Sequence, residues 1–393
     1  MSLPKYFKGT VSQKESEITI PTFFSGTSDI FEYDYDLIDE YVKYPLNHYT
    51  YIPNLSYPND VGYLCKNYLK SILYGYNHVY ITRLLKTLKT RGNLCLPLIH
   101  SWEGKVKIDN VVIITHPDDA ERICQKHIKK APIFKSFLYD SIISTTDNDD
   151  WKTQRSDMNM AFIPSLSLKR VFPTSLERAN HCCEILKESS ENFRESVNMS
   201  EFFLNETQAQ LQLSMFGFTN EFQERTNKRI RDAFAGIHTE YTDEFSEIAL
   251  KATNTSSGPL SQLLANSGDP LKAKGNTLIF TFAGHDTTGH TLSWLLYELC
   301  RNPEHKRRLI DEIDEYWRNN PEPRYETFSE LPFLTRCLTE TLRLWPALAN
   351  GTYRELESEE SIVGINGEMV VVPKGTYCQV MNWQRDRDPH LWG

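Results

Sequence analysis

The stretch from Asp269 to Arg301 constrains the fold more than any other part of the chain, because its pattern predicts one helix of about 32 residues. It opens with Asp269-Pro270, a capping residue followed by a proline that a first helical turn tolerates, and Asn302-Pro303 ends it. Apolar residues recur between these limits at steps of three and four: Leu278, Ile279, Phe282, Leu292 and Leu296. At 1.5 Å per residue the helix is roughly 48 Å long, enough to cross a whole domain.

The centre of this predicted helix contains residues that are unusual in a helix interior. It reads Ala283-Gly284-His285-Asp286-Thr287-Thr288. Glycine costs about 1 kcal/mol relative to alanine there, and threonine hydroxyls can bond back to the carbonyl four residues earlier and bend the helix. Glycine also lets a bulky group approach the backbone. The segment is either a locally kinked core helix with a satisfied polar pair, or a helix that passes over a flat cofactor with an acid and an alcohol facing a reaction centre.

Composition and charge exclude several classes of protein. The chain has 393 residues, of which 40% are hydrophobic and 24% charged, so it can form one large domain or two or three smaller ones. A net charge of -9 argues against general nucleic-acid binding. No run approaches the length of a membrane-spanning helix, and the first residues lack a signal-peptide pattern, so we expect a soluble, cytoplasmic protein as written. The eight cysteines form no C-x-x-C pair, which excludes a zinc ribbon and favours reduced thiols.

The order of predicted elements indicates a mainly α protein with a small β region. Residues 1–60 are irregular and tyrosine-rich, and we expect an N-terminal arm there, followed by a single domain over 61–393. Helices are predicted from Ile81 to Gly92, from Pro117, from Asp149-Asp150, within 175–250, over Pro303–Trp317 and over Leu331–Trp345. Short strands are predicted at Leu94–His100, Val111–Thr115, Ile362–Ile365, Glu368–Val372 and Thr376–Met381. The Ser-, Asn- and Gly-rich stretch Leu250–Asp269 is predicted to be a loop.

Two side-chain pairs on the predicted helices could carry function. Trp151 and Arg155 lie four residues apart and so share a helix face. They form either an aromatic–cation pair or two donors that point at one anion, since neither side chain has an acceptor. Glu340 and Arg343 lie three residues apart among leucines and Trp345, so we expect this pair to be buried.

Taken together and in this order, the motifs resemble those of the cytochrome P450 haem-thiolate monooxygenases. The resemblance covers residues 80–393 and rests on these segments: Trp151-x-x-x-Arg155, Ala283–Thr288, Leu331-Pro332-Phe333-Leu334, Glu340-x-x-Arg343, Val372–Thr376, Arg387-Asp388-Pro389 and Trp392-Gly393. Each motif alone is weak evidence for the resemblance, and Glu-x-x-Arg is the weakest.

This resemblance implies a cytochrome P450-like fold that binds haem (iron protoporphyrin IX) between the long helix and a proximal loop. Trp151, Arg155 and Arg354 are then expected to bind haem propionates. Ala283 and Gly284 are expected to line the distal face. Asp286 and Thr287 are the expected catalytic residues, which relay protons toward dioxygen. Glu340 and Arg343 are expected to brace the structure.

One departure from the family pattern concerns the iron ligand. The family holds its iron through a cysteine thiolate in a loop of pattern Phe-x-x-Gly-x-Arg-x-Cys-x-Gly, and no such pattern occurs in this sequence. Cys378 follows a turn and is expected to be a packed thiol, so no metal ligand is assigned. Two interpretations remain. The sequence is a C-terminally truncated version of an active monooxygenase, or it is a haem-poor, catalytically inactive scaffold. The intact Asp286-Thr287 pair favours the first.

The resemblance also implies reaction partners. We expect a flavoprotein reductase as electron donor, O2 as co-substrate and a lipophilic small molecule as substrate. Segments 131–149, 200–240 and 347–353 are expected to select the substrate. Family members in eukaryotes are commonly held at the endoplasmic reticulum membrane, which we expect here only if the native N-terminus carries an anchor.

Overall fold

The computed structural model describes residues 77–364 and 366–392, apart from 89–90, 103–104, 191–193 and most of 235–257. These residues form two compact units. A helical unit spans 152–347, and a sheet unit combines the chain up to Trp151 with residues 348–392. The arm predicted for residues 1–60 lies outside the described residues.

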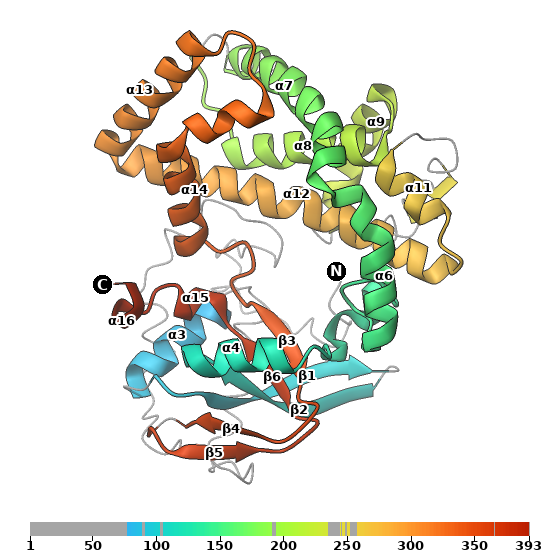
Figure 1. Ribbon diagram of the computed structural model, residues 1–393, viewed down its shortest axis with the longest axis vertical. Helices are drawn as coiled ribbons and strands as arrows, with labels where there is room; N and C mark the ends of the chain where they lie inside the picture. The colour runs from blue at the N-terminus through green and yellow to red at the C-terminus, as the bar shows by residue number, and fades with distance from the viewer. Residues whose placement is uncertain are drawn as a thin grey trace, which may run out of the picture. The chain divides into compact units, whose positions relative to one another are not determined.

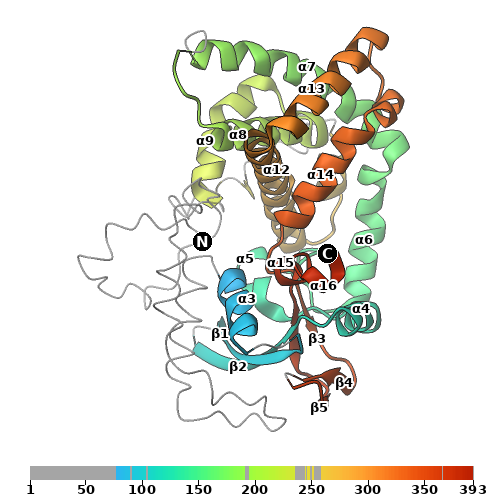
Figure 2. The same ribbon diagram turned by 90° about the vertical axis from the view of Figure 1, so that its left-hand side faces the viewer.

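The helical unit is built on the predicted long helix. Its elements are the larger part of α6 (Asn148–Phe162), α7 (Pro164–Ser189), α8 (Met199–Leu211), the π-turn η4 (Gln212–Phe216), α9 (Asn220–Phe234), α11 (Pro259–Ala265), α12 (Pro270–Arg301), α13 (Pro303–Asn319), the 3-10 turn η5 (Tyr325–Glu330) and α14 (Pro332–Leu344). Helix α8 lies along α12 in both views (Figures 1 and 2), and the two have the most extensive contact of any helix pair in this unit.

The boundaries of α12 confirm the sequence prediction in both length and capping. The helix has 32 residues. The Asp269 carboxylate accepts hydrogen bonds from the backbone N–H groups of Leu271, at 2.9 Å, and Lys272, at 3.3 Å, and so satisfies two donors that have no partner within the helix. At the other end, the N–H of Asn302 donates to the Glu298 carbonyl at 3.0 Å.

The loop predicted for Leu250–Asp269 is wrong in part, because α11 occupies Pro259–Ala265. The polar composition of this stretch favoured a loop in the prediction, although it contains a short helix whose Leu260 and Leu264 are almost completely buried. Proline at its first position starts it, and the Ser261 hydroxyl donates to the Phe216 carbonyl at 2.6 Å. The local composition favoured a loop, whereas burial against η4 stabilises a helix.

The sheet unit contains a four-stranded sheet, a two-stranded hairpin and short helices. Its elements are α3 (Asn77–Leu88), β1 (Leu94–Trp102), β2 (Lys105–Ile114), α4 (Pro117–Lys126), η3 (Pro132–Phe134), α5 (Lys135–Leu138), β3 (Thr352–Glu355), β4 (Glu360–Val363), β5 (Met369–Val372), β6 (Tyr377–Val380), α15 (Asn382–Arg385) and α16 (Pro389–Trp392). The sheet has the order β1-β2-β6-β3. Strand β6 pairs in parallel with β2 and antiparallel with β3. Figure 2 shows the separate β4–β5 hairpin near β3.

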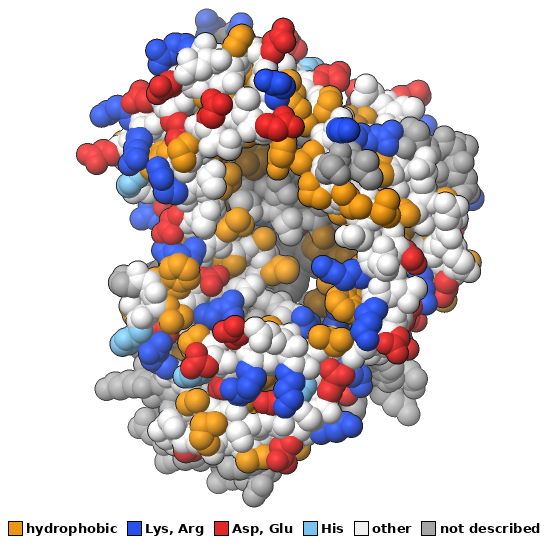
Figure 3. Space-filling view, viewed as in Figure 1, with side chains coloured by type: hydrophobic (Ala, Val, Ile, Leu, Met, Phe, Trp, Pro, Cys, Tyr) orange, Lys and Arg blue, Asp and Glu red, His pale blue; other side chains and the backbone are white. Residues whose placement is uncertain are grey.

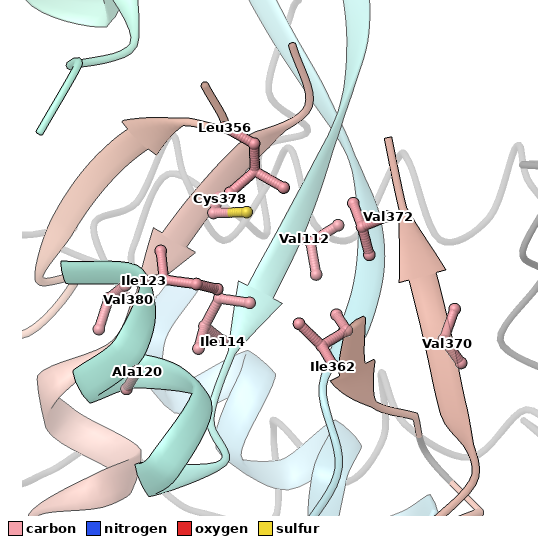
Figure 4. Packing of buried hydrophobic residues seen from close by; sticks show 10 residues of the cluster. All are labelled: Val112, Ile114, Ala120, Ile123, Leu356, Ile362, Val370, Val372, Cys378 and Val380. Atoms are coloured by element: carbon pink, nitrogen blue, oxygen red, sulfur yellow. The ribbon is translucent and has the colours of Figure 1, made fainter. Parts of the chain in front are cut away.

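Aliphatic side chains from the sheet, the hairpin and α4 make one core (Figure 4). Its members are Val112, Ile114, Ala120, Ile123, Leu356, Ile362, Val370, Val372, Cys378 and Val380. Figure 4 shows the Cys378 sulfur among these side chains. Since Ala120 and Ile123 lie three residues apart, α4 turns one apolar face onto the strands.

Hydrogen bonds and ion pairs join the β4–β5 hairpin to α4 beside this core. The buried Glu360 carboxylate on β4 is bonded to Arg122, to Lys126 and, at 2.9 Å, to the His127 Nε2. The buried Asp119 carboxylate accepts from the Arg122 guanidinium at 2.6 Å and from the Val363 N–H at 2.9 Å. These bonds satisfy charges that burial alone would destabilise.

Charged side chains cover the outer helices. Figure 3 shows basic and acidic residues interspersed over α13, where only Leu309 and Tyr316 are buried. Within the described part of the chain, no helix combines the length and apolar character that a membrane span requires.

Candidate functional site

The centre of α12 is an uninterrupted helix in which hydroxyl groups bond back to the backbone. The Thr287 hydroxyl donates to the Ala283 carbonyl at 2.8 Å. Thr281 and Thr291 make the same contact with the carbonyls four residues before them, at 2.7 and 2.8 Å. The back-bonding predicted for this segment is therefore present. A hydroxyl has one proton and two acceptor sites, so Thr287 Oγ1 keeps the capacity to accept.

The glycines of α12 allow α8 to pack closely. A Cβ added to Gly284 would lie 2.8 Å from both methyl groups of Leu211. A Cβ on Gly289 would lie 2.9 Å from a Leu204 methyl group and 3.0 Å from the Leu204 Cα. The bulky group that approaches the backbone at Gly284 is thus a side chain of this protein. The expected lining of a haem face by Ala283 and Gly284 remains a prediction, and both residues are half-buried.

Asp286 forms a pair with His290, a residue that the sequence analysis did not single out. The His290 Nδ1 lies 3.4 Å from the Asp286 Oδ1 and 2.8 Å from the Asp286 carbonyl oxygen. Burial opposes charge on this imidazole, but the hydrogen bond and the negative charge of Asp286 outweigh burial and raise the His290 pKa. The spacing of four residues was the available signal, since such residues are neighbours on a helix.

His285 differs from His290 because it is part of the core. It is 3% exposed, and its Nδ1 is bonded to the Thr281 carbonyl at 2.7 Å. Burial lowers its pKa and favours the neutral ring. The Thr207 hydroxyl of α8 donates to the His285 carbonyl at 2.9 Å. This side of α12 is a packing surface.

Trp151 and Arg155 both lie on α6, as the sequence predicts. The intervening Gln154 is buried and accepts from the Asn276 side-chain amide at 2.9 Å, which ties this part of α6 to α12. Arg155 is exposed, and Trp151 is half-buried. At the start of α6, the Asn148 amide donates to the Glu357 carboxylate at 2.8 Å, which fixes this end of the helix within the sheet unit.

The sheet unit brings Trp151, Lys130 and Arg354 into one neighbourhood. The Lys130 ammonium lies 5.4 Å from the centroid of the Trp151 ring, within cation–π range. The backbone of Lys130 forms an isolated antiparallel bridge with the backbone of Arg354, which lies within β3. Lys130 is a basic residue that the sequence analysis missed, because strand pairing brings it to β3 from far away in the chain.

Arg354 is a half-buried cation whose bonding is incomplete. Its Nη1 donates to the Thr352 hydroxyl at 2.7 Å and to the Tyr353 carbonyl at 3.3 Å, both neutral acceptors. Its Nε is buried and has no hydrogen-bond partner among the described residues, none of which supplies a carboxylate to this guanidinium. Burial lowers the Arg354 pKa. An anion placed here would restore a partner to the charge.

Glu340 and Arg343 form the predicted pair, but the prediction that this pair is buried is wrong. The pair itself is present on α14, where Arg343 donates to both carboxylate oxygens of Glu340, at 2.8 and 2.5 Å. The Glu340 side chain is 54% exposed. The hydrogen bonds from Arg343 lower the Glu340 pKa. The neighbouring leucines do not cover the pair, since Leu342 is itself 45% exposed. Whether the pair braces the native protein remains a prediction.

The described cysteines offer no metal site. Cys378 lies in β6 and is 1% exposed, as expected of a packed thiol, and burial raises its pKa. Over the described ranges, His, Cys, Asp and Glu side chains nowhere gather into a group of three that could hold a metal ion. No thiolate ligand is therefore assigned to a described residue.

Comparison with known proteins finds similarity to one family over part of the chain. Residues 269–393, which include α12, α14 and Arg354, match the family model of cytochrome P450. Cytochrome P450 3A11 of Mus musculus is 30% identical over 191 residues, which are 48% of this chain and 36% of the relative. Cytochrome P450 4F5 of Rattus norvegicus is 32% identical over 177 residues, 42% of this chain and 32% of the relative. Cytochrome P450 4F8 of Homo sapiens is 35% identical over 132 residues, 32% of this chain and 23% of the relative.

The match is confined to the C-terminal third of the chain. Over residues 269–393 this chain is similar to proteins of the cytochrome P450 family. The chain spans about a third of the length of the first relatives it matches. The mainly helical structure with its small β region is consistent with this family, which implies haem as the cofactor. The incompletely bonded guanidinium of Arg354 fits one anionic group of such a cofactor, because haem carries carboxylates.

Proposed function

We propose that the native protein is a haem-dependent monooxygenase that inserts one oxygen atom from O2 into a lipophilic small organic substrate. The observation that carries the proposal is the matched segment 269–393, which places Asp286 and Thr287 at the centre of the longest helix. Haem, when bound, supplies the iron chemistry that activates O2. A flavoprotein reductase is the proposed electron donor.

The proposed cofactor contacts come from basic and aromatic donors. Arg354 binds a propionate through the guanidinium edge that contains the unpartnered Nε. Trp151 and Arg155 supply an indole N–H and a second guanidinium, and Lys130 adds positive charge beside the Trp151 ring. Charge-assisted bonds of this kind are about twice as strong as neutral ones, so these residues retain the cofactor.

The proposed chemistry of this chain is proton delivery from α12. The Thr287 hydroxyl donates a hydrogen bond to the Ala283 carbonyl at 2.8 Å, so its oxygen keeps the capacity to accept a hydrogen bond from a partner. Asp286 is the adjacent acid: its carboxylate can take up a proton from solvent and, as the carboxylic acid, pass that proton to a group held at Thr287, which regenerates the carboxylate. Ala283 leaves space beside Thr287 because its side chain is a single methyl group.

Substitution of Thr287 tests this proposal in the native protein. Thr287→Ala removes the hydroxyl, and we expect electron consumption to continue while less product and more hydrogen peroxide form. Thr287→Ser keeps the hydroxyl and serves as the matched control, with coupling near that of the unchanged protein. Equal coupling in all three proteins would refute the relay. Absence of any haem-dependent turnover in the native protein would favour the alternative of an inactive, haem-poor scaffold.

A further inference from the structure

His290 is bound to Asp286 in a way that fixes its tautomer. The Asp286 carbonyl oxygen can only accept, so the His290 Nδ1, at 2.8 Å, must carry a proton. The same N–H lies 3.4 Å from the Asp286 Oδ1. The N–H is bonded to the Asp286 carbonyl and lies within ion-pair distance of the carboxylate of the same residue, one helical turn earlier. This contact orients the Asp286 carboxylate on the surface of α12.

The pair lies in surroundings that strengthen it. The side chains of Asp286 and His290 are 20% and 14% exposed, so solvent screens their attraction less than it screens an exposed pair. Loss of the proton from the imidazole would remove the charge but leave the bond to the carbonyl. The carboxylate would then be held by a neutral donor, which binds it more weakly.

Other ionisable groups also act on His290. On its own helix these are Asp286, which raises the pKa of His290, and His285, which is buried and favoured as the neutral ring. From α8, Glu201 also raises it, and Glu201 is itself ion-paired with Arg231 of α9. Because the Glu201 charge is shared with Arg231, Asp286 is the carboxylate with the larger effect, as its direct contact also indicates.

We propose that His290 is the positioning residue of Asp286, whose carboxylate its charged ring holds in place, and that loss of the charge weakens this hold on the carboxylate. The consequence for catalysis rests on the proposed monooxygenase function. When His290 is charged, the Asp286 carboxylate is held in place on α12, where it takes up protons from solvent and passes them on efficiently. As the pH rises and His290 becomes neutral, coupling of electrons to product falls.

A titration of the full chain followed by NMR tests the pair without any cofactor. With 15N-labelled histidine, the His290 signal is assigned as the one lost in His290→Gln. We expect its midpoint to lie above the ordinary 6.5. In Asp286→Asn it should fall by about one unit or more, since a close opposite charge shifts a pKa by roughly 1–3 units. Asp311→Asn removes an exposed carboxylate from α13 and is the control that leaves the midpoint in place.

Two further results keep the test decisive. If Asp286→Asn does not fold, Asp286→Glu retains the charge and should keep the His290 midpoint raised. A midpoint at or below 6.5 in the unchanged chain overturns the pair regardless of any variant. An unchanged midpoint in folded Asp286→Asn overturns it as well.

Activity of the native protein then tests the role of the pair. We expect coupling to fall as pH rises through the His290 midpoint, and His290→Gln to abolish this transition. Persistence of the transition in His290→Gln overturns the positioning role. If Thr287→Ala has no effect on coupling while the NMR result holds, the proposed function fails and the ion pair stands.

Discussion

The sheet unit holds two opposite charges in different surroundings: Glu360 is buried, whereas Arg354 is half-buried with a buried Nε. Glu360, on β4, is bonded to three basic side chains, which come from Arg122, Lys126 and His127. Arg354, on the neighbouring β3, donates only to a hydroxyl and a carbonyl, and its Nε is left without a partner in the part of the chain that the structure describes. Burial of a charge is costly unless the charge is paired. Glu360 has its pairing partners within the chain, whereas Arg354 does not have a carboxylate partner among the described residues.

This difference separates a structural role from a binding role. Burial alone would raise the pKa of Glu360, but the bonds from Lys126, His127 and Arg122 outweigh it and lower that pKa to about 2. Glu360 therefore stabilises the fold by holding the hairpin against α4. At Arg354, burial lowers the pKa and no carboxylate among the described residues compensates. Such a cation gains most when an anion from outside the chain binds it.

The largest effect is expected from Glu360→Gln. Three basic groups lose their shared carboxylate, and the unfolding free energy should fall by about 1.5–3 kcal/mol, the range for hydrogen bonds to charged groups. Urea denaturation of the full chain measures it. Glu359→Gln changes the exposed neighbouring residue and should alter stability by less than about 0.5 kcal/mol. Equal losses of unfolding free energy in the two variants would show that the Glu360 carboxylate does not stabilise the packing of the hairpin on α4.

A second effect concerns acid pH. The pKa of Glu360 is depressed on folding, so its contribution is complete above its unfolded value near 4.5 and is lost as pH falls toward about 2. We expect denaturation midpoints of the unchanged chain to drop between pH 4.5 and 2. The same drop should be smaller in Glu360→Gln, and identical pH profiles would contradict the assignment.

Arg354→Met should change haem binding more than stability. The loss of one charge-assisted bond, worth about 1.5–3 kcal/mol, should weaken haem retention by roughly tenfold or more. Retention is measured by haem transfer from the native protein to an excess of apo-acceptor. Lys374→Met removes an exposed charge from the same unit and should leave retention unchanged. If Arg354→Met lost as much stability as Glu360→Gln and retained haem as well as the unchanged protein, Arg354 would have a structural role like that of Glu360 and not a binding role.

Trp151→Phe should produce the smallest change. The variant keeps a ring beneath the Lys130 ammonium but removes the indole N–H, a bond worth about 1 kcal/mol, so haem loss should accelerate roughly fivefold. Trp317→Phe, at an exposed position of α13, is the control. No difference between the two variants would mean that the Trp151 N–H does not contact the cofactor.

Much of the helical structure could be predicted because its signals are local. Asp269-Pro270 and Asn302-Pro303 mark the ends of α12 by capping chemistry, and the structure places both ends there. The predicted helices at Pro303 and Leu331 were also found with similar limits. The β1–β2 hairpin was found too, but β2 begins at Lys105, six residues before the predicted start at Val111. These elements depend on neighbouring residues alone.

The features that could not be predicted depend on contacts between distant residues. Strand β3 was missed because its four residues are paired through β6 and not by local pattern. The exposure of Glu340 was missed because apolar neighbours in sequence do not reveal which face a helix buries. The unpartnered Nε of Arg354 depends on which groups lie around it in space, and no spacing in the sequence reports that.

The central proposal is that the native protein is a haem-dependent monooxygenase of the thiolate-ligated type, and its absorption spectrum tests this proposal most directly. The protein is purified from its source, reduced and exposed to carbon monoxide. We expect bound haem and the strongly red-shifted Soret band of a thiolate-ligated ferrous–CO complex. A protein that purifies without haem, or a Soret band typical of a histidine ligand, would contradict the account.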